Sequence, residues 1–499
     1  MSARLRTTVL AGVGFLALQL GWILCVAPNY GIDEFDHSYR ASSVALGHWE
    51  AGSEQVSADL GRGDLIPVRA DVAEAARAAC EARPYTRTFN CRPYETLANG
   101  EVMLASGASR YNPVFYGLVG TLAAPFHGTA NLYAMRLVTA LLGCALFMMT
   151  IWLTLAGART VWPLVAGLVA ALPTTVYSTA VATPNGLEML AGLAAWVALL
   201  ALVAPRGDQR RTPSYAALAV ASAVLANTHT LGLLWLGLIV VAVAVVHGPV
   251  VTARALLPRG GREIAIGLAT GVAIGFEIAW VLLSGVNSPS AERAIFLGNP
   301  WSAVARGIVL WPLQAIGAFP MRDEHAPALV YAVLLLVLVG MTVLAVLRRA
   351  GGGRVLLGIG FVALVSFAVP ASLTVISFHQ VGGAWQGRYG MPFTVGLIVL
   401  TGYLLDTDAR PFPQARFAAP AVAVGLVAVQ LLSQWHVMAG QRAKHALVEA
   451  THWSPPSALL LIALAAVALG CWVRATSTRP APISPEPARA EPVLMEANR

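Results

Sequence analysis

Long apolar stretches separated by short polar ones follow one another along most of the chain. The first runs from about Val9 to Val26, and similar stretches of about 18 residues or more recur as far as Val473. Runs of this length predict helices that cross a membrane. We therefore expect an all-α, polytopic transmembrane helix bundle over residues 1–474, with about twelve spans and a range of about 10 to 13.

Two of these runs do not fit a single ordinary span. The stretch Tyr111–Pro125 is short and bounded by prolines, so it either spans, re-enters the membrane or lies in the interface. The stretch Tyr215–His247 is too long for one span. It predicts two short helices that meet near Asn227-Thr228-His229.

The polar segments between the runs predict the topology. Short loops rich in arginine are expected in the cytoplasm, which leaves the large polar loops, residues 28–110 and 284–326, on the outer face. The first run is longer than the apolar core of a secretory signal, so it predicts an uncleaved span. Both termini are then cytoplasmic in a bacterial plasma membrane, and the Pro-, Glu- and Ala-rich residues 475–499 predict a disordered tail.

The composition agrees with a membrane protein and limits its partners. Hydrophobic residues make up 57% of the chain and charged residues 12%, against about 25% charged in soluble proteins. The formal net charge is +8, and Lys444 is the only lysine. Because no basic run with interleaved aromatics lies in a polar segment, we attribute the charge to topology and lipid headgroups and expect no nucleic-acid partner.

The cysteines divide into two groups. Cys80 and Cys91 lie in the first outer loop, where an oxidising exterior favours a disulfide over two free thiols. Cys25, Cys144 and Cys471 lie in apolar runs and are expected to be packing residues.

The most unusual polar stretch is Gly31–Arg40, which crowds three carboxylates, a histidine and an arginine together at the exit from the first span. A helix over residues 33–50 would be amphipathic, and its apolar stripe would comprise Phe35, Tyr39, Leu46 and Trp49. Its opposite face would carry Asp33, His37 and Arg40, with Asp36 beside them. Such a helix is expected to lie on the membrane surface with its apolar face down.

Two interpretations of this charged face stay open. In the first, a carboxylate acts as a general base toward an acceptor hydroxyl, and His37 or Arg40 orients it. In the second, the face is merely solvated and holds an Asp36–Arg40 pair that stabilises the helix by a few tenths of a kcal/mol.

A second distinctive stretch, Gly382–Pro392, reads Gly-Gly-Ala-Trp-Gln-Gly-Arg-Tyr-Gly-Met-Pro and is expected in a short outer loop. Arg388 lies on the side of the membrane where arginine is disfavoured. Its planar guanidinium suits a pair of phosphate oxygens. The alternative is an interfacial anchor beside Trp385 and Tyr389.

Several motifs together resemble the DUF2142 family of bacterial membrane proteins, over about residues 10 to 440. They are Asp33-Glu34, Asn112-Pro113, Tyr116, Arg136, and Gln386-Gly387-Arg388-Tyr389 with Pro392. The family in turn is similar to the GT-C superfamily of membrane glycosyltransferases. This resemblance implies a GT-C-type bundle, a polyprenyl-phosphate-linked sugar as donor and an extracytoplasmic active site with a catalytic Asp in the first outer loop.

Carried over to this chain, the resemblance assigns the catalytic position to Asp33, with Glu34 as its usual neighbour. Arg388 matches the late basic residue expected near the donor phosphate. The chain departs from many relatives at Asn185, where they carry Asp, so any role of that Asp in metal or acceptor binding is missing here.

Further charged residues lie beside or inside the predicted spans. The Asp323-Glu324-His325 stretch is either a second acidic wall, with a divalent metal shared with Asp33, or a helix cap, which we favour. No zinc or calcium motif is present, so we predict no metal site and no cofactor. Arg136, inside an apolar span, is expected to pair with a lipid phosphate, and Glu188 and Glu277 also lie in spans.

The sequence thus predicts an inverting glycosyltransferase that moves a sugar from a polyprenyl-phosphate donor to an envelope glycan or glycolipid. The predicted catalytic residues are Asp33, Glu34 and His37, and the predicted substrate-binding residues are Arg388, Tyr389, Gln386, Arg136 and Arg40. Two rivals remain: a transporter or flippase of a lipid-linked precursor, and a non-catalytic scaffold of an envelope-synthesis complex. A short distance between Asp33 and Arg388 would favour the enzyme, since one head group could then touch both.

Overall fold

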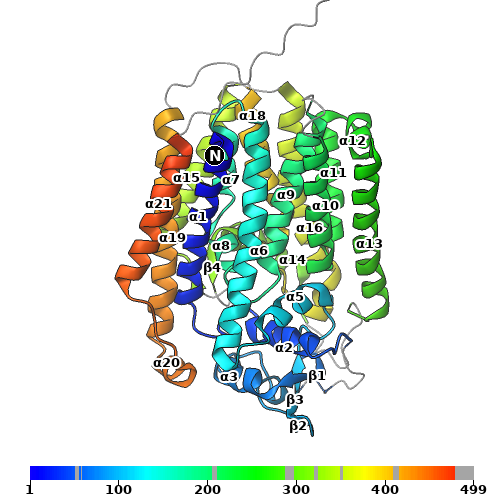
Figure 1. Ribbon diagram of the computed structural model, residues 1–499, viewed down its shortest axis with the longest axis vertical. Helices are drawn as coiled ribbons and strands as arrows, with labels where there is room; N and C mark the ends of the chain where they lie inside the picture. The colour runs from blue at the N-terminus through cyan, green and yellow to red at the C-terminus, as the bar shows by residue number, and fades with distance from the viewer. Residues whose placement is uncertain are drawn as a thin grey trace, which may run out of the picture.

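The computed structural model describes residues 1–50, 56–57, 59–204, 211–286, 297–319, 324–348, 352–407 and 415–477. Asp323 and most of the predicted tail lie outside these residues. The described chain forms a bundle of long helices with a small polar unit at one end (Figure 1). The prediction of an all-α polytopic membrane protein is confirmed, although the polar unit adds a small sheet.

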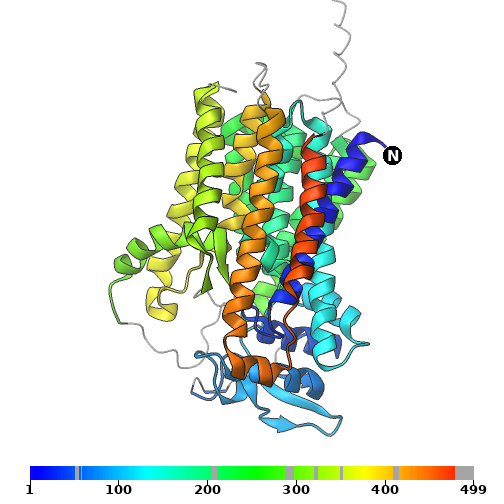
Figure 2. The same cartoon turned by 90° about the vertical axis from the view of Figure 1, so that its left-hand side faces the viewer.

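Nine helical segments of the described chain are long and apolar enough to cross a membrane. They are α1 (Ala3–Cys25), α6 (Gly128–Gly157), α9 (Asn185–Val203), α13 (Gly261–Leu283), α15 (Ala328–Leu347), α16 (Gly352–Val381), the run from η2 to α18 (Gly387–Thr407), α19 (Ala415–Arg442) and α21 (Ala458–Ser477). In Figures 1 and 2 the start of α1 and the end of α21 lie at the same end of the bundle.

This number is lower than the predicted number of spans because several apolar runs are broken into short helices. Pro173 begins a new helix inside the run 161–178, and residues 229–231 separate two helices as predicted. The described helices outside the nine segments and the polar unit are α5 (Pro113–Ala123), α7 (Trp162–Val169), α8 (Pro173–Ser178), α10 (Arg211–Thr228), α11 (Gly232–His247), α12 (Pro249–Leu256), α14 (Pro300–Gly317) and α20 (His445–Thr451). The segment Gly387–Thr407 itself contains α17 (Met391–Thr394) and α18 (Gly396–Thr407).

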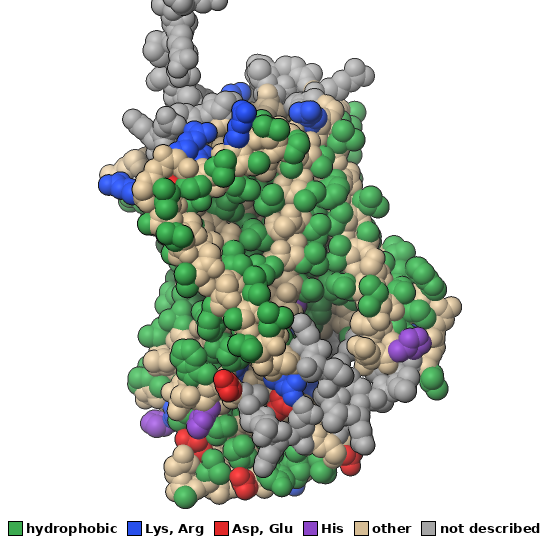
Figure 3. Space-filling model, turned by 90° about the vertical axis from the view of Figure 1, so that its right-hand side faces the viewer, with side chains coloured by type: hydrophobic (Ala, Val, Ile, Leu, Met, Phe, Trp, Pro, Cys, Tyr) green, Lys and Arg blue, Asp and Glu red, His purple; other side chains and the backbone are tan. Residues whose placement is uncertain are grey.

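Charge separates the two ends of the bundle. On the face shown in Figure 3, most charged side chains at the end that holds the N-terminus are basic, acidic side chains lie with some basic ones at the opposite end, and a hydrophobic band lies between. A basic bias at one end is what the positive-inside rule expects of a cytoplasmic face.

The described residues between 28 and 110 form the polar unit, called here the cap. It contains α2 (Glu34–Ala45), β1 (Asp64–Arg69), α3 (Ala70–Glu81), α4 (Thr88–Cys91), β2 (Glu95–Thr96) and β3 (Glu101–Ser106). The three strands pair antiparallel in the order β1-β3-β2, and Asp64 lies opposite Ser106. A second short pair, β4 (Ala318–Phe319) with β5 (Glu324–His325), lies in the second large loop.

The prediction of a surface helix over residues 33–50 was wrong in two respects. The helix ends at Ala45, and Trp49 beyond it is 55% exposed. Phe35 and Tyr39 do not face lipid but are buried in a core that the sheet and α3 complete. The helical periodicity of the sequence identified the apolar face of α2 correctly. This face packs against strands that lie about 30 to 70 residues later in the chain.

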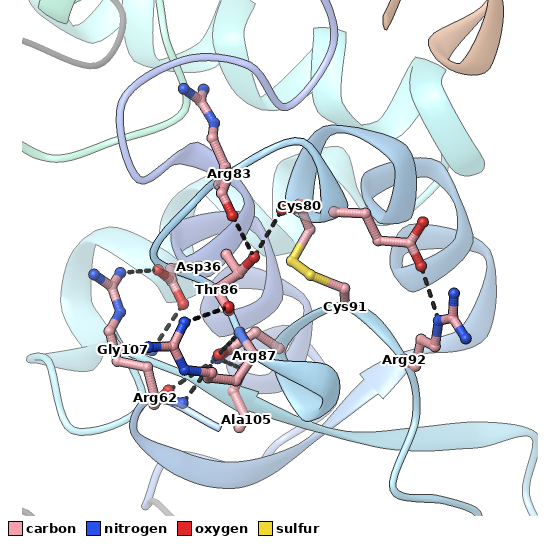
Figure 4. Close-up of a disulfide and its surroundings, with 12 residues drawn as sticks. Asp36, Arg62, Cys80, Arg83, Thr86, Arg87, Cys91, Arg92, Ala105 and Gly107 are labelled. Atoms are coloured by element: carbon pink, nitrogen blue, oxygen red, sulfur yellow. Dashed lines mark hydrogen bonds and ion pairs between the residues drawn. A yellow bond between two sulfur atoms is a disulfide. The ribbon is translucent and has the colours of Figure 1, made fainter. Parts of the chain in front are cut away.

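A disulfide joins Cys80 at the end of α3 to Cys91 at the end of α4, as predicted (Figure 4). It lies beside the cap core, to which both cysteines belong. The three remaining cysteines are free and pack in or beside the bundle.

Loss of this disulfide should loosen the cap. For a loop closed over 11 residues, the entropy model gives about 3 kcal/mol of stabilisation. We expect the double variant Cys80→Ala/Cys91→Ala to become sensitive to protease within the cap at a lower temperature than the wild type. The free-cysteine variant Cys471→Ala serves as control. Equal sensitivity of the double variant and the wild type would contradict the expectation.

Candidate active site

Asp33 begins the site, at the junction of α1 and the cap. It precedes the first turn of α2 and has a left-handed backbone (φ 52°, ψ 14°), which Asp tolerates better than most residues. Its side chain is 27% exposed, in contrast to the fully buried residue that follows it. Asp33 is therefore a carboxylate that a substrate can reach.

Two arginines and a tyrosine surround this carboxylate. Arg388 Nη2 lies 3.3 Å from Asp33 Oδ2, and Arg62 Nη2 lies 3.7 Å from Oδ1. The Tyr85 hydroxyl donates to Oδ1 at 3.3 Å. The structure thus brings together Asp33 and Arg388, which are 355 residues apart in the chain.

Arg388 is held in place by its own loop. It lies in the short 3-10 helix η2 (Gly387–Gly390), and its guanidinium is 5.2 Å from the centre of the Tyr389 ring. Gln386 donates to the Tyr389 hydroxyl at 3.0 Å. Gly387 permits the close approach to α14, because a Cβ there would lie 1.9 Å from the carbonyl oxygen of Trp311. The predicted residues Gln386, Arg388 and Tyr389 therefore form one packed element next to Asp33.

Arg62 was not predicted, and it comes from the cap. Its guanidinium is paired with Asp36, whose carboxylate also accepts from the Gly107 N–H at 2.7 Å (Figure 4). Burial raises the pKa of Asp36 above its usual value, although Arg62 acts in the opposite direction. Asp36 thus fixes Arg62 beside Asp33. No motif surrounds Arg62 in the sequence, and only the fold of the cap brings it to the site.

Glu34 and Arg136 form a separate, fully buried ion pair. The Arg136 Nε–Glu34 Oε1 and Nη2–Oε2 distances are 2.8 and 2.6 Å, and both side chains are 0% exposed. Arg136 also donates to three backbone carbonyls at the end of α1, and Glu34 accepts from two backbone N–H groups. Arg136 is therefore paired with Glu34 and not with a lipid phosphate, contrary to expectation, and Glu34 contacts no solvent.

His37 and Arg40 also differ from their predicted roles. His37 is buried, its Nδ1 lies 2.7 Å from the Tyr116 hydroxyl, and its ring stacks on Tyr116. Arg40 is buried and donates to the backbone carbonyls of His48, Trp49 and Tyr111. Both side chains are buried and bonded to these partners, so they support α2 and are not the exposed polar face of the helix that the sequence predicted.

The buried His37 predicts a pH-dependent stability. Burial lowers its pKa to about 4 from an ordinary value of 6.5, with Arg388 and Arg62 acting in the same direction and Asp33 opposing them. The stabilisation by neutral His37 is complete above pH 6.5 and is lost as the pH falls toward 4, up to about 3 kcal/mol. We expect His37→Gln, which keeps an acceptor for Tyr116, to lose less stability than the wild type between pH 7 and 4.5.

Thermal unfolding of the purified protein at several pH values measures this difference. His127→Gln is the matched control, because the His127 side chain is 80% exposed. If the two variants and the wild type lose stability in parallel, the buried imidazole is not the cause.

Glu188 and Glu277, the two carboxylates that the sequence placed inside spans, lie near the same end of the bundle as Asp33. Glu188 is buried, and its Oε1 is 3.9 Å from His229 Nδ1. The His229 ring lies 5.6 Å from that of Tyr389, next to Arg388. Glu277 accepts from the Asn112 amide at 2.5 Å. Among the residues that the structure describes, no three His, Cys, Asp or Glu side chains gather as a metal site.

A family model described as "Predicted membrane protein (DUF2142)" matches residues 16–397. The chain belongs to the DUF2142 family. The resemblance predicted from the Asp33-Glu34 and Gln386–Pro392 motifs is thereby confirmed. The match includes both Asp33 and Arg388, so the two sides of the site lie within the region that defines the family.

One solved structure similar to this DUF2142 protein is ArnT from Cupriavidus metallidurans bound to undecaprenyl phosphate. The identity is 13%, the TM-score is 0.43, and the alignment covers 95% of this chain and 77% of that one. At these values the similarity decides neither a shared activity nor a shared ligand. No curated protein matches the sequence.

Proposed function

We propose that this DUF2142 protein is a membrane glycosyltransferase of GT-C type that uses a polyprenyl-phosphate-linked sugar. The observation that carries the proposal is the partly exposed Asp33 carboxylate between the guanidinium groups of Arg388 and Arg62. The carboxylate can act as a base, and the two guanidinium groups beside it can bind a phosphate. General base catalysis of sugar transfer from a phosphate donor requires both groups within reach of one substrate.

In the proposed reaction Asp33 takes the proton of an acceptor hydroxyl. The acceptor oxygen forms a bond to the anomeric carbon while the bond from that carbon to the phosphate oxygen breaks. The polyprenyl phosphate leaves with the electron pair, and Arg388 and Arg62 stabilise its negative charge. One displacement of this kind inverts the anomeric centre.

The location of the site agrees with a lipid-linked donor. Asp33 and Arg388 lie where the cap meets the membrane-spanning helices, so a phosphate at the membrane surface is near both. The acidic end of the bundle would face the outside of a bacterial plasma membrane, and the acceptor would be an envelope glycan or glycolipid.

Reconstitution in liposomes tests the proposal against its rivals. Purified protein is given polyprenyl-phosphate-linked sugars and an envelope glycolipid extract, and both sugar transfer and movement of the donor across the bilayer are followed. Transfer without translocation supports the enzyme. Translocation without transfer supports the flippase. The scaffold is supported if the protein shows neither activity and if cells that carry Asp33→Asn/Arg388→Ala still make a normal envelope product.

A further inference from the structure

A cavity of about 150 Å³ lies beside the Asp33–Arg388 pair and takes no part in the reaction described above. Its walls come from the residues before α5, the turn between α10 and α11, and the cap end of α13 (Figure 1). One of its lining residues contacts the supporting His37, and another contacts Tyr389 of the site. The Tyr111 ring lies 5.9 Å from that of His37, and the His229 ring lies 5.6 Å from that of Tyr389.

The cavity is polar on several sides. Asn112, Glu277, Thr228 and Thr230 line it. The Asn112 amide donates to Asn227 and Glu277, and the Thr228 hydroxyl donates to the Val224 carbonyl. Among these four, the Glu277 carboxylate and the Thr230 hydroxyl are therefore the side chains left for a ligand. Asn112 donates to Glu277 Oε2, but a carboxylate has about four lone-pair positions, so acceptor capacity remains. His229 accepts from the Leu231 N–H at Nδ1, which places the proton of the neutral imidazole on Nε2.

Aromatic rings complete the walls. Trp280 is held by a hydrogen bond from its indole N–H to the Arg110 carbonyl at 2.9 Å, and Tyr111 contributes a second ring. A combination of aromatic faces with carboxylate and hydroxyl groups suits a ligand that carries many hydroxyls on an apolar ring. A cavity of about 150 Å³ is large enough for one six-membered ring.

The charge of the cavity separates it from the phosphate site. Its described lining residues include Glu277 but no Arg or Lys, so it offers no cationic side chain to a phosphate. Arg388 and Arg62 attract that group at the neighbouring position. The polar ring and the phosphate of one substrate would therefore bind at two adjacent positions, the ring in the cavity and the phosphate at the two arginines.

We propose that this cavity binds the pyranose ring of a monosaccharide, which the reaction either donates or accepts. The inference rests on the proposed function and deepens it, since it names the part of the substrate that each half of the site recognises. Glu277 and His229 would bind ring hydroxyls, and Trp280 would cover an apolar ring face.

Binding measurements on the full chain in lipid nanodiscs test the proposal. The probes are undecaprenyl phosphate, its phosphodiesters with glucose, galactose, mannose and N-acetylglucosamine, and the methyl pyranosides of these sugars. Thr230→Phe fills the cavity from an exposed turn position, and Thr121→Phe, exposed on α5, is its matched control. Glu277→Gln keeps the side-chain shape and provides a second variant.

We expect the wild type to bind at least one sugar-bearing probe, with Thr230→Phe weakening that binding about tenfold and Glu277→Gln severalfold. Binding of undecaprenyl phosphate alone should be unchanged in both variants and lost in Arg388→Ala. A loss confined to the lipid-linked sugars identifies the donor ring, and a loss confined to the methyl pyranosides identifies the acceptor ring.

The proposal is overturned if the wild type shows no contribution of the sugar to affinity, or if both cavity variants bind every probe as the wild type does. If, in that case, the wild type still binds undecaprenyl phosphate and Arg388→Ala does not, the phosphate-binding role in the proposed function stands. If the wild type does not bind undecaprenyl phosphate, the proposed function as a whole is contradicted.

Discussion

Asp33→Asn should lower the rate of sugar transfer by about 10²- to 10⁴-fold, because it removes the proposed general base. The protein should still fold, since the side chain is 27% exposed and Asn tolerates the left-handed backbone at this position. The turnover number measures the effect in reconstituted protein at matched protein level. Substrate affinity should change much less than turnover.

Glu74→Gln is the matched control for this variant. Glu74 is an exposed carboxylate of the cap, with a side chain 63% exposed, and it pairs only at the surface with Arg77. Its activity should equal that of the wild type. Full activity of Asp33→Asn, or an equal loss in Glu74→Gln, would sink the assignment of Asp33 as the base.

The second large effect is expected on stability. Arg136→Met leaves the Glu34 carboxylate buried without its partner, which costs about 3 to 5 kcal/mol. Glu34→Gln should cost a similar amount, because it leaves the buried guanidinium uncompensated. The double variant should lose less than the sum of the two single losses, since no unpaired charge remains.

Unfolding in detergent, followed by loss of helical signal, measures these differences. The exposed pair Glu74–Arg77 is the control, and its removal should change the free energy of unfolding by less than about 1 kcal/mol. Additive losses in the Glu34 and Arg136 variants would show that the ion pair is not the stabilising interaction.

The sequence predicted most of the membrane-embedded fold because the length of an apolar run is fixed by the thickness of the bilayer. The break near His229 could also be predicted, since a run of that length cannot be one span. The sequence does not show which part of the chain packs against an apolar helix face. Phe35 and Tyr39 have the right period for a surface helix, but only the three-dimensional arrangement of the sheet shows that they are covered.

The same distinction applies to the site. Asp33 and Arg388 were marked as candidates by local charge and topology and assigned roles by a family resemblance, but no local property of the sequence predicts a contact across 355 residues. Arg136 was assigned to a lipid because an intramembrane arginine needs a negative partner, and its actual partner, Glu34, had been placed in the active site. Arg62 has neither a motif nor an unusual position in the sequence, so only the structure identifies it.

The two arginines beside Asp33 belong to different parts of the molecule. Arg62 is carried by the cap, and Arg388 is carried by the loop that enters the bundle. A shift of the cap by a few ångströms would change the distance of Asp33 from Arg388 and of Arg388 from Arg62 at the same time. Cap position and the charge around the carboxylate are therefore coupled, so a ligand that bridges both arginines would also fasten the cap to the membrane-spanning helices.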